Sequence, residues 1–136
     1  SEQKLCLILA DVDHFKAFND NYGHLLGDAV LKGLARTLQR GCRDGISAYR
    51  FGGEEFALIV PNKPLRIARQ FADTMRRATE KLSVKDRRSG KHVGNITISL
   101  GVAELQEKES VESLIERADG LLYEAKSLGR NRVMPL

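Results

Sequence analysis

The stretch Ile46–Val60, which reads ISAYRFGGEEFALIV, decides the fold of this chain of 136 residues. Its two halves, Ile46–Phe51 and Glu55–Val60, are rich in aromatic, β-branched and other apolar residues, as strands typically are. Between them lie Gly52-Gly53, which permit the positive φ angles of a tight hairpin turn. The stretch therefore predicts a β-hairpin with two carboxylates, Glu54-Glu55, at its turn.

The rest of the chain alternates between strand and helix patterns. Leu5–Ala10 is a continuous apolar run, which predicts a strand buried on both faces. Apolar and polar residues alternate along Ile96–Val102, and Arg130–Met134 predicts a short last strand. Apolar residues at helical spacing predict helices in four places: His14–Asn21, Leu26–Gly41, and the segments after Pro64 and Ser110. This order predicts an α/β (α+β) fold, a single domain over residues 1–136 with helices packed on one mixed sheet.

Composition fits one compact domain without cross-links. Apolar residues make up 42% of the chain, and Cys6 and Cys42 match no disulfide or zinc framework. The longest apolar run is far too short to cross a bilayer, and Ser1–Lys4 lacks a signal-peptide pattern. We expect a cytoplasmic domain that makes no membrane contact itself, although a longer parent protein can be anchored elsewhere.

A net charge of +4 suits a polyanionic ligand, which can be a nucleoside triphosphate or a nucleic acid. The densest basic cluster, Lys85–Arg88, is interrupted by Asp86 and lies in the polar segment Lys85–Gly94. Aromatic residues do not interleave with this cluster, so stacking on single-stranded bases is not favoured. We therefore expect a solvated loop there and no nucleic-acid partner.

Two acidic clusters follow predicted strands. Asp11-Val12-Asp13 ends the first strand, and Glu54-Glu55 stands at the hairpin turn. If the first strand lies beside the hairpin, both clusters meet at one edge of the sheet, where carboxylates repel unless a cation neutralises them. Mg²⁺ is typically bound by one or two carboxylates together with substrate phosphates. Capping of a turn or helix is the alternative role for an Asp-x-Asp at this position.

Residues that can bind a nucleotide follow the first cluster. His14-Phe15-Lys16 starts a predicted helix, where backbone N–H groups and a lysine can bind phosphate. Asn19 and Asp28 flank Tyr22-Gly23-His24 and can together hydrogen-bond the amide edge of guanine. Solvent exposure of Lys16, capping by Asn19 and Asp28, and a packing role for His24 remain open alternatives.

These motifs, taken together, resemble the GGDEF family of diguanylate cyclases. Gly52-Gly53-Glu54-Glu55-Phe56 is similar to the signature of that family in its GGEEF form. The similarity extends in the same order to segments spread over nearly the whole chain: Asp11–Lys16, Asn19-Asp20, Tyr22–His24, Gly27-Asp28, Ile96–Val102, Ala118-Asp119, Leu122-Tyr123, Ala125-Lys126 and Gly129–Asn131.

The resemblance implies a palm-like fold similar to adenylyl cyclase catalytic domains, with a mixed, mostly antiparallel sheet flanked by helices. It also implies condensation of two GTP molecules into cyclic di-GMP and two pyrophosphates. It implies that Asp11 and Glu54, with the carbonyl of Val12, hold Mg²⁺ (Mn²⁺ is also possible), and that Glu54, Lys16 and Asp11 serve catalysis. It implies further substrate contacts: Asn19, Asp28 and His24 for guanine, His14, Phe15 and Lys16 for phosphate, Lys126 and Arg130 for the triphosphate, and Gly52 and Gly53 at the turn.

The resemblance also implies partners. Each domain of the family binds one GTP, so turnover requires a homodimer in which two domains face each other. A covalently linked N-terminal regulatory domain is expected in the parent protein. Family domains usually open with a helix bearing a D-x-L-T-G-L-x-N-R-R type segment, and this chain starts after that segment. We therefore expect a domain that lacks the usual opening helix.

Two other functions remain open at this stage. A degenerate member of the family can bind GTP as a regulatory input without turnover, although the intact Gly52–Phe56 motif and Asp11 favour catalysis. Another palm-type enzyme, such as an adenylyl cyclase, would use ATP, whereas Asn19 and Asp28 favour guanine.

The inhibitory product site of the family, an Arg-x-x-Asp shortly before the hairpin, is predicted to be degenerate here. Arg43 aligns with its arginine, but Ile46 occupies the aspartate position and Asp44 stands at the wrong spacing. An apolar side chain cannot accept hydrogen bonds from guanine, so we expect little product inhibition through this site. A cyclic di-GMP titration checks this expectation, and tight binding at Arg43 would contradict it.

Overall fold

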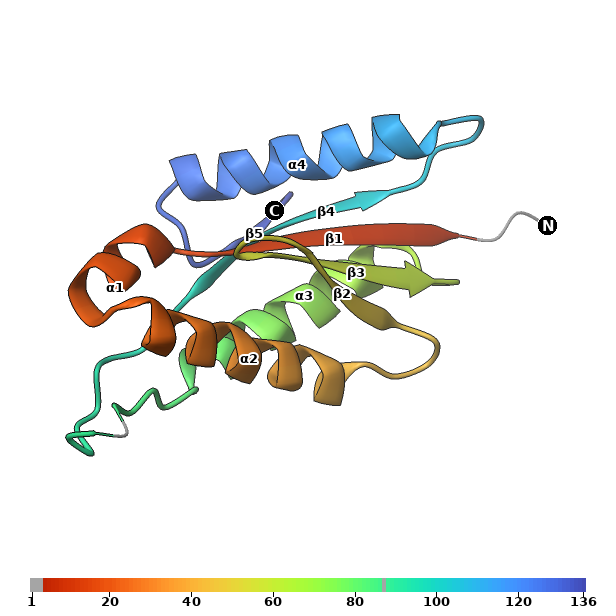
Figure 1. Ribbon diagram of the computed structural model, residues 1–136. Coiled ribbons are helices and arrows are strands. Elements are labelled where there is room, and N and C mark those ends of the chain that lie inside the picture. Colours follow the sequence, from red (N-terminus) through yellow and green to blue (C-terminus); the bar gives the residue numbers. More distant parts are fainter. Residues whose placement is uncertain (1–3, 87) are drawn as a thin grey trace.

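A five-stranded sheet in the order β2-β3-β1-β4-β5 runs through the computed structural model, which describes residues 4–86 and 88–136 (Figure 1). Ser1–Gln3, and Arg87 of the basic cluster, lie outside the described residues. β1 pairs antiparallel with both β3 and β4, and β4 pairs parallel with β5. The strands are β1 (Leu5–Val12), β2 (Ser47–Gly52), β3 (Glu55–Pro61), β4 (Ile98–Glu104) and β5 (Val133–Met134). The predicted mixed, mostly antiparallel sheet flanked by helices is confirmed.

Helices cover the two faces of the sheet unequally. α2 and α3 pack on one face around a large apolar cluster that includes Ile8, Leu34 and Leu58 (Figure 1). α4 alone covers the other face, where its Leu122 belongs to the same apolar cluster as Leu9 of β1. The helices are α1 (Phe15–Tyr22), α2 (His24–Gly41), α3 (Leu65–Glu80) and α4 (Val111–Ser127). The predicted hairpin, the buried first strand and the helices are thus confirmed, with α2 starting two residues earlier than expected.

The strand β4 is buried on both faces, which the alternation of polar and apolar residues did not indicate. Ser99, Gly101 and Ala103 alternate with the larger apolar residues of β4, and all of these residues are buried. They face α4 or the end of β1 and not the solvent, because α4 lies directly on this strand.

Gly101 makes the close approach of α4 possible. A Cβ atom at this position would lie 2.3 Å from the carbonyl oxygen of Ala118 and 2.4 Å from the amide nitrogen of Leu122. Both are backbone atoms of α4, so the helix itself would have to move away from the sheet.

The last predicted strand is shorter than expected. β5 comprises only Val133–Met134, because Arg130 and Asn131 adopt positive φ angles of 65° and 47°. Such angles are incompatible with an extended strand, so Arg130 and Asn131 belong instead to the loop between α4 and β5.

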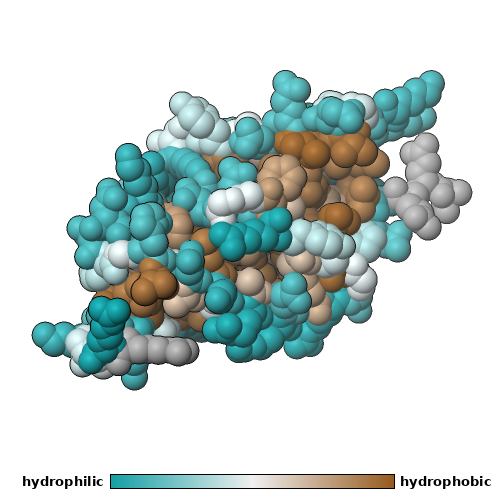
Figure 2. Space-filling model, viewed as in Figure 1, coloured by the Kyte–Doolittle hydropathy of each residue, from teal (hydrophilic) through white to brown (hydrophobic). Residues whose placement is uncertain are grey.

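Apolar side chains gather on the visible surface beneath the right-hand end of α4, over the strands (Figure 2). Ile59 of β3 and Tyr49 of β2 belong to the sheet face that α4 covers and are 38% and 54% exposed. Within the described residues, no helix has the length and the apolar character that a membrane span requires.

Substitution of Gly101 by alanine should loosen α4. We expect Gly101→Ala to lower the free energy of unfolding by about 1–3 kcal/mol, because a crowded core forces backbone shifts. The matched control is Gly120→Ala on α4, where an added Cβ would meet nothing within 4 Å and should stabilise the helix by about 0.5–1 kcal/mol. Urea unfolding of both variants measures the difference, and equal stability of Gly101→Ala and wild type would refute the close approach.

Candidate active site

The two acidic clusters meet at one edge of the sheet, as predicted. Asp11 near the end of β1 is the register partner of Glu55 on β3 and of Ser99 on β4. The amide of Val12 donates a hydrogen bond of 3.4 Å to the carbonyl oxygen of Glu54 in the hairpin turn. Asp11 is only 3% exposed. The pairing of β1 with β3 therefore brings a buried carboxylate beside the glutamates of the turn.

The Asp11 carboxylate is only partly compensated. Its Oδ2 accepts a hydrogen bond from the ammonium group of Lys126, which lies in the last turn of α4. Its Oδ1 is buried and has no hydrogen-bond partner within the described residues. A buried carboxylate oxygen without a partner is costly, so this atom is ready to bind a donor or a cation.

The charges of this cluster oppose ionisation of the glutamates. Burial raises the pKa of Glu54, and the negative charge of Asp11 and the hydrogen bond that a protonated Glu54 makes to it raise it further, against an opposing effect of Lys126. Burial, followed by the charges of Asp11 and Asp119, also raises the pKa of Glu55. Three acids around one lysine leave excess negative charge at this edge.

A hard divalent cation fits this donor set. Among the described residues, no group of three His, Cys, Asp or Glu side chains could enclose a metal ion. Mg²⁺ commonly uses one or two carboxylates and takes its remaining oxygens from water and phosphate. Asp11 and Glu54, with the nearby backbone of Val12, offer such an incomplete set, and the unpartnered oxygen of Asp11 is its clearest sign.

The predicted phosphate-binding turn lies directly after this cluster. His14 adopts a left-handed conformation with φ of 56° and precedes α1, whose first residue, Phe15, is buried. Lys16 is exposed on the first turn of this helix. The free N–H groups of a helix start and a nearby lysine can bind an anionic oxygen.

Asn19 lies within α1, near the junction with α2, and its side-chain oxygen is buried and without a partner within the described residues. A Cβ atom at Gly27 would lie 1.8 Å from this oxygen, so Gly27 is what leaves room for the amide group. Asp28 follows Gly27 on the exposed side of α2, and His24 is exposed at its start. The structure thus groups the three predicted guanine contacts around this junction.

Two predicted phosphate contacts come from the far end of the chain. Lys126 reaches Asp11, as described above, and Arg130 follows in the loop after α4. The amide of Arg130 donates a hydrogen bond of 3.0 Å to the carbonyl of Ala125, which fixes the loop to the helix end.

In the turn between β2 and β3, Gly53 has φ of 43° and its carbonyl accepts a hydrogen bond from the Nε of Arg50.

Asp13 has a role that the sequence did not reveal. The motif placed it with the acidic cluster, but its carboxylate accepts hydrogen bonds from the hydroxyls of Thr97 and Ser99 and from the amide of Asn131. These donors satisfy it within the protein. The sequence signal that could have revealed this role is the pair of hydroxyl residues, Thr97 and Ser99, among apolar residues, because a buried hydroxyl needs a hydrogen-bond partner.

The residues of the expected product site lie away from this edge. Arg43 and Asp44 are exposed in the loop before β2, whereas Gly52, the last residue of β2, and Gly53 lie at its opposite end. Ile46 is partly buried against the main apolar cluster, and its amide bonds the carbonyl of Arg43. Its side chain therefore packs on the edge of the core.

Comparison with known proteins identifies the family. Residues 1–132 match the family described as diguanylate cyclase, GGDEF domain. The chain is 68% identical over 134 residues to the diguanylate cyclase VdcA of Vibrio cholerae and 46% identical over 132 residues to the diguanylate cyclase DgcM of Escherichia coli K12. The two alignments include 98% and 97% of this chain, but only 40% and 31% of the length of the two relatives.

A solved structure agrees with the sequence comparison. The GGDEF domain of DgcB from Caulobacter crescentus, determined in complex with c-di-GMP, superposes with a TM-score of 0.93 at 40% identity, covering 96% of this chain and 77% of that one. The chain therefore belongs to the GGDEF domain family of diguanylate cyclases.

The raised pKa of Glu54 predicts a pH-dependent stability. Since the folded state binds this proton more tightly than the unfolded state, the contribution of Glu54 to stability is largest at low pH and is lost as pH rises through the raised pKa. We expect Glu54→Gln to melt at a higher temperature than wild type at pH 8, with a difference that shrinks towards pH 4.5.

Thermal melts in the presence of a chelator measure this effect. Glu107→Gln, at an exposed position, is the control and should change the melting temperature little at any pH. A stabilisation by Glu54→Gln that stays constant from pH 4.5 to pH 8 would contradict the assigned cause.

Proposed function

We propose that this domain catalyses the condensation of two GTP molecules into cyclic di-GMP and two pyrophosphates. The 68% identity to a diguanylate cyclase supports this activity, and so does the likeness to a GGDEF domain that binds c-di-GMP. Because the chain spans 40% of that relative, the activity of the whole protein is part of the proposal.

One observation carries the proposal: among the residues that the structure describes, one oxygen of the buried Asp11 carboxylate has no partner. This oxygen lies near Glu54, at the edge where a lysine and a helix start also lie. We assign Asp11, Glu54 and the carbonyl of Val12 to Mg²⁺, which Mn²⁺ can replace. The ion, when bound, supplies positive charge to phosphate oxygens and lowers the pKa of a coordinated hydroxyl.

The remaining residues bind and orient the nucleotide. His14, Phe15 and Lys16 contact phosphate at the start of α1, and Lys126 and Arg130 contribute positive charge from the opposite end of the chain. At the other end of the site, Asp28 accepts from the N1–H and amino group of guanine, with Asn19 and His24 as its neighbours. Asn19 and Asp28 thereby favour GTP over ATP.

The reaction needs positioning more than a protein nucleophile. The 3′-oxygen of one GTP loses its proton, with Glu54 assisting, and attacks the α-phosphorus of the other GTP. The bond from that phosphorus to the bridging oxygen breaks and pyrophosphate leaves. In the second step, the 3′-oxygen of the other GTP attacks the α-phosphorus of the first, a second pyrophosphate leaves, and the ring closes. Since each domain binds one GTP, two copies must face each other.

Regulation is proposed to come from outside this domain. The much greater length of VdcA and DgcM supports a covalently linked N-terminal regulatory domain in the parent protein. The apolar side chain of Ile46, partly buried against the main cluster, supports a degenerate product site at Arg43, because it offers no hydrogen-bond acceptor to guanine.

Turnover of GTP tests the proposal directly. We expect the chain at high concentration with GTP and Mg²⁺ to yield cyclic di-GMP, detected by chromatography. Glu54→Ala should reduce the rate by at least about 100-fold, since it removes a proposed ligand of Mg²⁺ and the carboxylate that assists deprotonation of the 3′-hydroxyl. Glu107→Ala, an exposed acid, is the matched control.

The other outcomes are equally informative. Full activity of Glu54→Ala would move the metal assignment elsewhere, and a preference for ATP would overturn the roles of Asn19 and Asp28. Binding of GTP by calorimetry without product, in this chain and in the longer parent, would identify a regulatory GTP-binding module instead.

A further inference from the structure

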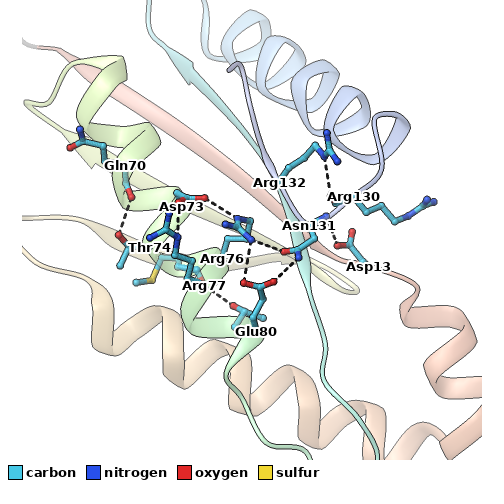
Figure 3. Close-up of polar contacts among 12 residues, drawn as sticks. Asp13, Gln70, Asp73, Thr74, Arg76, Arg77, Glu80, Arg130, Asn131 and Arg132 are labelled. Carbon is cyan, nitrogen blue, oxygen red and sulfur yellow. Dashed lines mark hydrogen bonds and ion pairs between the residues drawn. The ribbon is translucent and has the colours of Figure 1, made fainter.

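Asp13 is a buried carboxylate that three separate donors surround. It is 7% exposed and directly follows β1. Its Oδ1 accepts from the hydroxyl of Ser99 at 2.6 Å, and its Oδ2 accepts from the hydroxyl of Thr97 at 2.7 Å. Oδ2 also accepts from the amide of Asn131 at 3.0 Å (Figure 3). Its own amide donates to the carbonyl of Thr97 at 2.9 Å. Both its backbone and its side chain are thus fixed to neighbouring segments.

The loop after α4 needs this support. Arg130 and Asn131 both have positive φ angles, a conformation that costs L-residues free energy and persists only where the surroundings hold it. Asp13 holds the Asn131 amide, and the carbonyl of Arg132 accepts from the amide of Leu100 at 3.0 Å. Arg130 therefore projects from a loop whose next residue is tied to Asp13.

The other side of the loop is held by α3. The side-chain oxygen of Asn131 accepts from Arg76 at 3.0 Å, and its nitrogen donates to Glu80 at 2.7 Å (Figure 3). Arg76 is held in turn by Asp73 at 2.8 Å. Asn131 is clamped between the end of β1 and α3.

Asp13 also adjoins the other phosphate-binding segment. It is bonded to His14, the first residue of the turn before α1, and lies two residues after Asp11. One residue therefore links two segments that are 118 positions apart in the chain and that approach the same edge of the sheet.

We propose that Asp13 is a positioning residue: its carboxylate fixes the loop at 129–131 against the start of α1, so that Arg130 and the turn at 14–16 are held at a set separation for one triphosphate. This inference rests on the proposed function, because that function assigns Arg130 to the nucleotide. Asp13 itself does not contact substrate.

A double-mutant cycle tests whether Asp13 acts through Arg130. The ligand is a GTP analogue with a methylene bridge between the α and β phosphorus atoms, measured with Mg²⁺ by calorimetry. We expect Asp13→Ala to weaken its binding about tenfold, the effect typical of a lost hydrogen bond to a charged group. In an Arg130→Ala background, Asp13→Ala should add less than about a twofold loss, since interacting residues are not additive.

Two further variants separate positioning from stability. Asp13→Asn keeps an oxygen that can accept from Thr97 and Asn131, so it should restore binding to within about threefold of wild type. Leu38→Ala, in the core of α2, should lower the melting temperature without changing analogue binding at a temperature where the protein is folded. Equal losses from Asp13→Ala with and without Arg130, or an equal loss from Leu38→Ala, would overturn the proposal.

Amide hydrogen exchange gives a readout that needs no nucleotide. Asp13→Ala should raise exchange at residues 129–132 by at least about tenfold, as expected when a supporting hydrogen bond is lost. Asn131→Gly keeps the backbone conformation and the amide but removes the clamp to α3, and should raise exchange at the same residues even if Asp13→Ala fails to fold. Unchanged exchange in the folded variants would overturn the proposal, whereas a wild type that orders this loop yet binds no analogue would refute the proposed function alone.

Discussion

The antiparallel pairing of β1 with both β3 and β4 leaves the side chain of Asp11 only 4% exposed, and the rest of the site depends on that burial. A buried charge must be paired, and the partner that the structure supplies is Lys126 at the end of α4. Lys126 can reach Asp11 only because α4 lies close on the sheet, where Gly101 leaves room for its backbone. The packing of a helix on a strand thus determines the charge balance of the site.

This balance is incomplete in a way that suits a nucleotide. Lys126 stands against Asp11, Glu54 and Glu55, and burial, followed by repulsion from Asp11, raises the pKa of both glutamates. A protein selected for stability alone would not keep these acids together, since an apolar or neutral residue at one of them would relieve the repulsion. In the proposed function, a cation resolves the conflict, and the triphosphate that accompanies it meets the positive charges of Lys16 and Arg130. The destabilised cluster is consistent with a binding site whose ligands complete it.

Local chemistry made the hairpin, the buried first strand and most helices predictable, because Gly52-Gly53 and regular apolar spacing act within a few residues. The sequence could not show that β4 is buried on both faces, since that depends on how closely α4 approaches Gly101. It also missed the role of Asp13, which requires contacts to Ser99 and Asn131 more than 80 positions away. The resemblance to a family supplied the candidate residues, whereas the structure supplied the charges and hydrogen bonds that relate them.

The two ends of the site differ in their exposure, and the difference bears on how the reaction can occur. Asp11 is enclosed by strands on both sides, while His24 and Asp28 are exposed at the start of α2, beside Tyr22 and Leu25 at 46% and 79% exposure. A site that completed catalysis alone would need to exclude water around both reacting nucleotides. This domain encloses the acidic end and leaves the other end open. Such an open half-site supports the proposal that a second domain, with its own GTP, closes it from the facing side.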